Sequence, residues 1–114
     1  MRIEALQQEV RTLMQGIEHP RVGAALALAE ECGEVMRWVL EREVYGGKEK
    51  SLLAEEVGDV LLALAEICDR YELSLEACAT DAVAKLRRKA PEWREALGGS
   101  LEDVRRRMDG GSSE

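Results

Sequence analysis

The sequence predicts a single all-α domain, and three observations point to this fold class. Apolar residues recur at helical spacings of three and four along most of the 114-residue chain. No alternating run of β-branched residues and no Asn-Gly hairpin signal competes with that pattern. Glycine and proline gather at a few positions that would separate helices. A chain of this length has room for one domain of ordinary size.

The first predicted helix covers residues 2–18. Its apolar side chains alternate at spacings of three and four and form a narrow, heptad-like seam. They are Ile3, Leu6, Val10, Leu13 and Ile17. Because small domains bury a low fraction of their surface, we expect this seam and the broadly apolar helices that follow to join a second copy of the chain.

The next two predicted helices form an antiparallel hairpin. Pro20 can open the first of them, which covers residues 21–44 and ends at the turn signal Tyr45-Gly46-Gly47. The other covers residues 50–70. Since a short turn joins the two helices, they would run side by side in opposite directions.

A fourth helix is predicted over residues 75–89, with Ser74 as its N-cap and its end before Pro91. Residues 91–97 would add one helical turn, and Gly98-Gly99-Ser100 would act as a joint. The prediction is therefore one all-α domain over residues 1–97 and a short extension over residues 98–114. In that extension LEDVRRRM would form a short helix, and DGGSSE would be disordered.

Composition excludes several classes of protein. The net charge is −7, from 16 Lys and Arg against 23 Asp and Glu, so stable nucleic-acid binding by bulk charge is not expected. No apolar run approaches the roughly 18 residues of a membrane span, and the charged N-terminus does not resemble a signal peptide. We expect a cytoplasmic protein without a membrane partner. Its three cysteines lack a CxxC spacing and would stay reduced, and His19 is its only histidine, which excludes a His-rich metal centre.

Two similar acidic segments carry the candidate chemistry. Each reads Glu-Glu-x-Gly-acid, and each contains an acid-x-x-acid pair: Glu31 with Glu34, and Glu56 with Asp59. Residues three apart lie on the same side of a helix, so each pair can point at one common spot. The alternative is that both pairs belong to solvated faces, which are common in an acidic protein.

The positions of the pairs argue against solvated faces. Glu31 lies on the helical face that carries Ala24 and Ala27, and Glu56 shares a stripe with Val60 and Ala63. Carboxylates are costly to bury unless they are paired or bound to metal. Both pairs also lie about 19 Å from the turn at 1.5 Å per residue, so in a hairpin they face each other.

Converging carboxylates repel one another unless a cation lies among them. Oxygen ligands without His or Cys select Mg²⁺, Mn²⁺ or Ca²⁺, and Mg²⁺ held by carboxylates normally completes its shell with water and substrate phosphates. The sequence therefore predicts a site for Mg²⁺, with Mn²⁺ as a substitute. Its predicted ligands are Glu31, Glu34, Glu56 and Asp59.

Several segments together resemble the MazG-type nucleoside triphosphate pyrophosphohydrolases. They are LALAEECGEV, the glycine-containing turn, LLAEEVGDVLLALAEI and DAVAKLRRKAPEW, and they span about residues 20–93. The resemblance implies a four-helix, all-α fold assembled as a dimer or a dimer of dimers. It also implies Mg²⁺-dependent cleavage of the α–β phosphate bond of a nucleoside triphosphate, which gives a nucleoside monophosphate and pyrophosphate. The four carboxylates match the family's metal ligands, and Lys85 and Arg88 match basic residues expected near the phosphates.

The helical spacing agrees with that role for the basic residues, because Asp81, Lys85 and Arg88 fall on a single stripe. An ordinary surface pair between Asp81 and Lys85 is the alternative. Of the acids, we assign catalysis to Glu34 and Glu56: Glu34 would orient or deprotonate the attacking water, and loss of Glu56 would nearly abolish activity. Trp38, one turn beyond Glu34, is a candidate for stacking on the nucleobase, or else a core residue.

Two alternatives to this activity remain at the level of sequence. The related phosphoribosyl-ATP pyrophosphohydrolases share a helical carboxylate site and cleave the same bond, although the segment from Lys85 to Trp93 favours the MazG type. The second alternative is a helical module for dimerisation or metal sensing, which would bind metal at this site and would not hydrolyse a nucleotide. The expected partners are a nucleoside triphosphate and further copies of the chain, in a homodimer or homotetramer.

Overall fold

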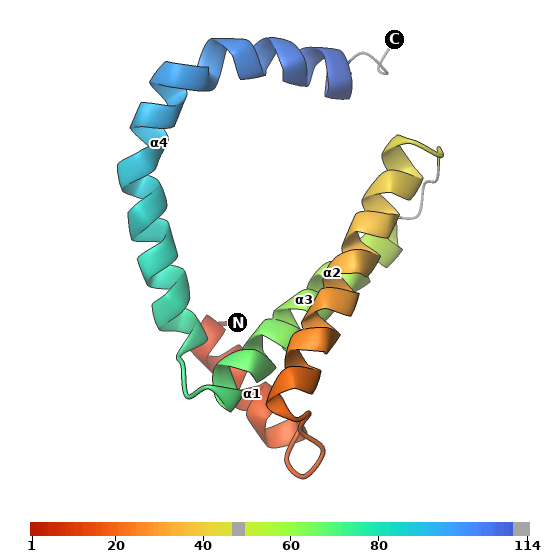
Figure 1. The fold of residues 1–114 in the computed structure, drawn as a ribbon, viewed down its shortest axis with the longest axis vertical. Helices are drawn as coiled ribbons and strands as arrows, with labels where there is room; N and C mark the ends of the chain where they lie inside the picture. The colour runs from red at the N-terminus through yellow and green to blue at the C-terminus, as the bar shows by residue number, and fades with distance from the viewer. Residues whose placement is uncertain (47–49, 111–114) are drawn as a thin grey trace. The chain divides into compact units, whose positions relative to one another are not determined.

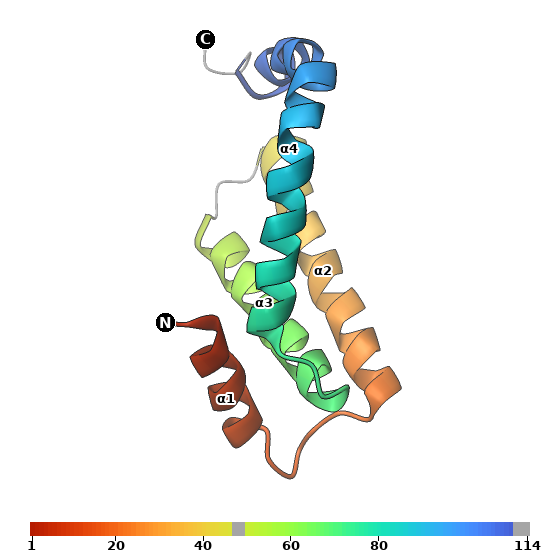
Figure 2. The ribbon, with the colours of Figure 1, turned by 90° about the vertical axis from the view of Figure 1, so that its left-hand side faces the viewer.

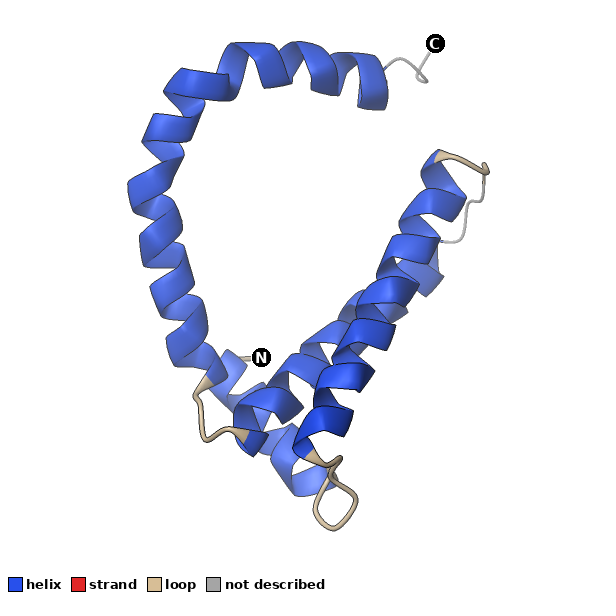
Figure 3. Cartoon of the chain, in the orientation of Figure 1, coloured by secondary structure: helices blue, strands red, loops and turns tan. Residues whose placement is uncertain are grey.

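The computed structural model describes residues 1–46 and 50–110, and every regular element in this part of the chain is helical (Figure 3). The elements are α1 (Ile3–Leu13), α2 (Arg21–Glu43), α3 (Lys50–Arg70), α4 (Leu75–Arg105) and a short π-helical segment (Arg106–Gly110). The all-α prediction is confirmed. The chain divides into two compact units, Met1–Cys78 and Ala79–Glu114.

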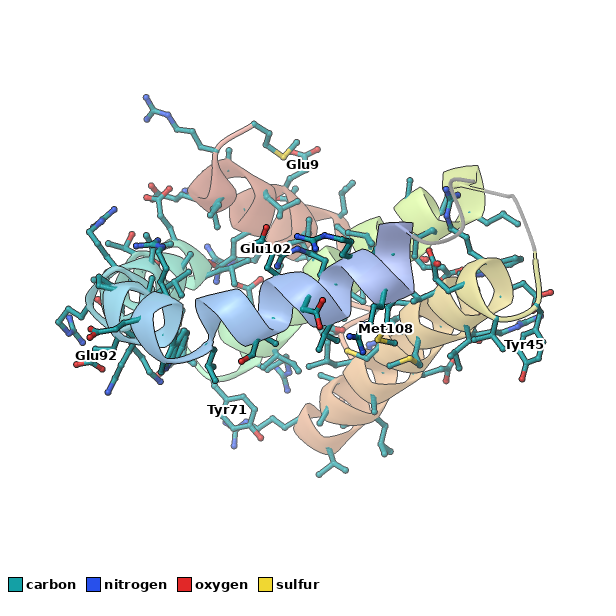
Figure 4. The ribbon with its side chains drawn as sticks, turned by 90° about the horizontal axis from the view of Figure 1, so that it is seen from above. Glu9, Tyr45, Tyr71, Glu92, Glu102 and Met108 are labelled. Carbon is teal, nitrogen blue, oxygen red and sulfur yellow. The ribbon has the colours of Figure 1, made fainter. Side chains whose placement is uncertain are left out.

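Helices α2 and α3 form the predicted antiparallel hairpin. They lie side by side along most of their length and run in opposite directions (Figures 1 and 2). Gly46 follows α2 with a φ of +80°, a left-handed conformation that favours glycine and ends the helix. Gly47, the other glycine of the predicted turn, lies outside the described residues. The Tyr45 ring projects away from this end of α2 (Figure 4).

Helix α1 is shorter than predicted, because it ends at Leu13 and not near residue 18. The cause is Gly16, whose φ of +84° turns the backbone into the left-handed region and whose N–H donates to the Glu18 carboxylate at 3.0 Å. Ile17 therefore leaves the predicted seam and lies in the connecting loop, 68% exposed. Within the seam only Val10 is buried.

The remaining part of α1 packs on α3 of its own chain, and Gln7 fixes the contact (Figure 2). The buried Gln7 amide donates to the Asp69 carboxylate at 2.9 Å and to the Leu73 carbonyl at 2.8 Å. Its oxygen accepts the Leu75 N–H at 2.8 Å, at the start of α4. The Ser74 hydroxyl accepts the Ala77 N–H at 3.1 Å, which confirms the predicted N-cap.

Helix α4 is longer than predicted. It continues through Pro91 and the Gly98-Gly99 pair to Arg105, so the expected helix end and joint are wrong, and the domain boundary predicted at residue 97 lies inside the helix. Proline removes one hydrogen bond and can kink a helix without ending it, and α4 bends where its colour passes from cyan to blue (Figure 1). Of the tail predicted to be disordered, the first two residues belong to the π-helical segment, and residues 111–114 lie outside the described part.

The core of the described chain consists mainly of small side chains. The buried apolar residues are Val10, Ala24, Ala63, Ala65 and Cys68. Larger apolar side chains remain exposed, among them Val22 and Leu26 on α2 and Val57 and Leu61 on α3. All three cysteines are free thiols, as predicted. No helix in the described part of the chain is both long enough and apolar enough to cross a membrane.

Candidate metal centre

Three of the four predicted metal ligands meet across the α2–α3 hairpin. Glu31 comes from α2, and Glu56 and Asp59 come from α3. One carboxylate oxygen from each lies within 4.8 Å of the others, which is close enough for a single ion to contact all three. We call Glu31, Glu56 and Asp59 the acid cluster. The antiparallel hairpin brings them together because they lie at matching distances from the turn.

The helical faces explain which acid of each Glu-Glu pair takes part. Glu31 and Glu56 are half-buried between the helices, whereas the preceding Glu30 and Glu55 are exposed. A step of one residue turns the side chain by about 100° around a helix, which is enough to move it from the inner face to the outer one. The predicted placement of Glu31 and Glu56 on inner helical faces is confirmed.

Glu34 does not belong to the acid cluster. Its carboxylate lies 3.5 Å from the Arg37 guanidinium on the same helix, and its side chain is 38% exposed. Its negative charge nevertheless acts on Glu56. The structure therefore places Glu34 beside the cluster and outside the set of oxygens that one ion could reach together.

The electrostatics of the cluster show the cost of gathering these charges. Partial burial of the Glu56 carboxyl, followed by the negative charges of Asp59, Glu34, Glu31 and Glu55, raises the pKa of Glu56 above its usual range. Among the described side chains, no Lys, Arg or His forms an ion pair with a member of the acid cluster. A divalent cation would relieve this repulsion, and three carboxylates suit a hard ion that keeps water or phosphate as its other ligands.

A cavity of about 370 Å³ adjoins the acid cluster within the first unit. Glu31 and Asp59 line it together with His19 and Glu66, and its other walls are apolar. Those walls come from α1, α2 and α3: Val10, Leu13, Met14, Ala27, Leu62 and Ala63. A site with apolar walls and a few polar groups is typical of small-molecule pockets.

The other predicted substrate contacts are Trp38, Lys85 and Arg88. Trp38 is half-buried on α2, and the Arg37 guanidinium carbon lies 5.4 Å from the centroid of its ring, so a cation already covers one face. Lys85 and Arg88 are exposed on α4, in the second unit, and within the described residues neither forms an ion pair. Their roles stay predictions.

Glu66, which the structure places in the cavity wall, is not among the residues predicted for the site. Glu66 is only 6% exposed and accepts hydrogen bonds from His19. Two signals could have found it. It lies seven residues after Asp59, hence on the same face of α3, and with Asp69 it forms a further acid-x-x-acid pair.

Comparison with known families agrees with this geometry. The model of the MazG nucleotide pyrophosphohydrolase domain matches residues 23–93, a segment that contains the whole acid cluster as well as Trp38, Lys85 and Arg88. Comparison with curated proteins and with solved structures gave no match. The matched segment covers more than half of the chain and ends within α4. The chain therefore belongs to the MazG nucleotide pyrophosphohydrolase family.

Proposed function

We propose that this chain is a Mg²⁺-dependent pyrophosphohydrolase that converts a nucleoside triphosphate into a nucleoside monophosphate and pyrophosphate. The observation that carries the proposal is the acid cluster: three carboxylates from facing helices converge within 4.8 Å, and no cation of the described chain pairs with them. Membership of the MazG family indicates nucleotide pyrophosphohydrolase activity in general. The identity of the metal, the triphosphate substrate and cleavage at the α–β bond go beyond family membership and are part of our proposal.

Glu31, Glu56 and Asp59 would hold the cation, and Mn²⁺ could replace Mg²⁺ because it accepts the same oxygen ligands. When bound, the ion would offset phosphate charge and lower the pKa of a coordinated water. Glu34, which lies beside the cluster and is not needed to complete it, would orient that water or accept its proton. Lys85 and Arg88 would offset charge on the departing pyrophosphate.

The cavity beside the acid cluster is our candidate for the nucleoside half of the substrate. Glu31 and Asp59 at one end would leave the phosphates near the cation, and the apolar walls would contact the sugar and base. This placement competes with the earlier proposal that the base stacks on Trp38, since Arg37 covers one face of that ring. The Trp38→Ala variant separates the two, because it would raise KM strongly only if the ring stacks on the base.

The decisive experiment measures pyrophosphate release from a panel of nucleotides that includes phosphoribosyl-ATP, with Mg²⁺ and with a chelator. Release from nucleoside triphosphates that stops on chelation would support the proposal. Release from phosphoribosyl-ATP alone would replace it with the related pyrophosphohydrolase activity. No release from any member would leave a non-catalytic module for dimerisation or metal sensing.

We further propose that the chain acts as a homodimer or homotetramer. The support is the row of exposed apolar side chains on the hairpin, including Val22 at 71% and Leu26 at 66% exposure. The seam of α1 contributes less than predicted, since Val10 is buried within its own chain. Light scattering at micromolar concentration tests the proposal, and a stable, active monomer of 12.7 kDa would refute it.

A further inference from the structure

Glu66 is a buried carboxylate that the proposed chemistry does not use. It lies on α3, 6% exposed, and burial of a carboxylate is costly unless hydrogen bonds satisfy it. Both of its oxygens are engaged by His19. The His19 backbone N–H donates to Oε2 at 2.8 Å, and the ring Nδ1 lies 2.8 Å from Oε1 and 3.0 Å from Oε2.

The same contacts hold the His19 ring at the wall of the cavity that adjoins the acid cluster. The backbone beside it packs closely on α2: a Cβ added at Gly23 would lie 3.3 Å from Pro20 Cδ and 3.5 Å from His19 Cβ. Asp59 and Glu66 are two helical turns apart on one face of α3, roughly 10 Å at 1.5 Å per residue, which is the length scale of a nucleoside monophosphate. A nucleotide with its phosphates at the acid cluster would therefore bring its base toward His19.

The carboxylate also determines which ring nitrogen carries the hydrogen. An ionised carboxylate only accepts hydrogen bonds, so Nδ1 must be the donor toward Glu66. In the neutral ring Nε2 is then an acceptor. The ring contacts that hold His19 run through Nδ1, and its side chain is 47% exposed, so we take Nε2 to be open to a ligand.

We propose that Glu66 is a positioning residue that makes His19 Nε2 an acceptor for the exocyclic amino group of cytosine or adenine. This inference rests on the proposed function. The chain then prefers nucleotides whose base carries an amino group to those that carry an oxo group at the same position. An oxo oxygen is an acceptor, so it could not form a hydrogen bond with Nε2, which is also an acceptor. His19 lies outside residues 23–93, the segment that matches the family model, so the match to the family does not by itself imply this preference.

The kinetic test compares kcat/KM for CTP with UTP and for ATP with ITP. We expect the unaltered chain to favour the amino member of each pair by at least about tenfold. In Glu66→Gln the new amide would donate to Nδ1 and move the ring hydrogen to Nε2, so the preference should disappear or reverse. In His19→Ala the ratio should approach one. A ratio near one in the unaltered chain, or an unchanged ratio in Glu66→Gln, would overturn the proposal.

Asp69→Asn is the matched control. Asp69 lies one turn further along α3 and is also a partly buried carboxylate, but its partners are Gln7 and Arg11 and it does not line this cavity. A loss of α3 packing should therefore affect both variants, whereas a change in the amino-to-oxo ratio should occur in Glu66→Gln alone. An equal change of the ratio in Asp69→Asn would assign the effect to packing and refute the role of Glu66.

A second measurement does not depend on turnover. Because the chain has one histidine, ring-nitrogen NMR of ¹⁵N-histidine-labelled protein without a polyhistidine tag reports His19 alone. Spectra of the neutral ring should show the hydrogen on Nδ1 in the unaltered chain and on Nε2 in Glu66→Gln. Titration with CMP should shift the Nε2 resonance more than titration with UMP.

The opposite tautomer, or equal responses to CMP and UMP, would overturn the proposal even if no triphosphate is cleaved. Absence of cleavage alone would refute only the proposed function.

Discussion

Helix α3 carries two acid-x-x-acid pairs, and the two pairs differ in the side chains that surround them. Glu66 and Asp69, near its C-terminal end, both have partners within the chain. His19 binds Glu66 through its backbone N–H and its ring, and the Arg11 guanidinium lies 2.7 Å from Asp69.

Glu56 and Asp59, nearer the start of the same helix, face a third carboxylate, Glu31. No cation among the described side chains pairs with this cluster. The two pairs have the same spacing on the same helix, so spacing alone does not separate them. Their neighbours do: the C-terminal pair anchors α1 and the loop before α2, whereas the other pair leaves negative charge for a cation from solution.

The largest expected effect comes from Glu56→Gln. Removal of one charge from the acid cluster should lower nucleotide turnover at least about 100-fold, because metal sites depend strongly on each group that holds or orients the ion. Pyrophosphate release measures the loss, and far-ultraviolet circular dichroism should show unchanged helix content. Glu55→Gln, one residue away on the exposed face, is the control and should keep its activity. Turnover in Glu56→Gln equal to that of the unaltered chain would remove the site assignment.

A substitution of Gln7, which binds the C-terminal end of α3, should change the stability of the fold. Gln7→Ala removes three hydrogen bonds from a buried position and leaves the Leu75 N–H without its acceptor, so it should lower the free energy of unfolding by about 2–3 kcal/mol. Urea unfolding followed by circular dichroism measures the change. A loss below about 0.5 kcal/mol would show that α1 is not anchored through this side chain.

The acid cluster should make the metal-free chain less stable as pH rises. The pKa of Glu56 is raised in the folded state, so folded protein holds this proton more tightly than unfolded protein. The contribution of Glu56 to stability is therefore fully present below the ordinary pKa of a glutamate and is lost as pH rises through the raised pKa of the folded state. In chelator, Glu56→Gln should melt at a higher temperature than the unaltered chain at neutral pH and lose this advantage in acid. Thermal melts across pH 4 to 8 measure it, and equal melting temperatures throughout would contradict it.

The smallest effect is expected at Arg11. Its side chain is 59% exposed, so solvent screens the ion pair with Asp69, and Arg11→Ala should cost about 0–1 kcal/mol of stability. The difference should shrink further in 1 M salt, because added ions screen an exposed pair. A larger, salt-independent loss would show that the Arg11 stem contributes through packing and not through its charge.

The two errors in the predicted helix ends have opposite causes. The apolar spacing of residues 2–18 is helical throughout, yet the left-handed φ of Gly16 ends α1 three residues earlier, at Leu13. Conversely, Pro91 and Gly98-Gly99 are weak helix formers, yet α4 passes through them. Local signals describe a preference of about 1–3 kcal/mol per residue, and in α4 the helix-forming residues on either side of Pro91 and of the glycine pair outweigh a preference of that size.

The sequence by itself determined the all-α class, the bounds of α2 and α3, and the facing of Glu31 with Glu56 and Asp59. All three follow from helical periodicity and from equal distances to one turn, which are properties of nearby residues. Only the tertiary structure decided that Glu34 pairs with Arg37 beside the acid cluster, that α1 packs on α3 through Gln7, and that Glu66 holds His19 at the cavity wall. These contacts join residues far apart in the chain or choose between partners at equal spacing, and no local pattern contains that information.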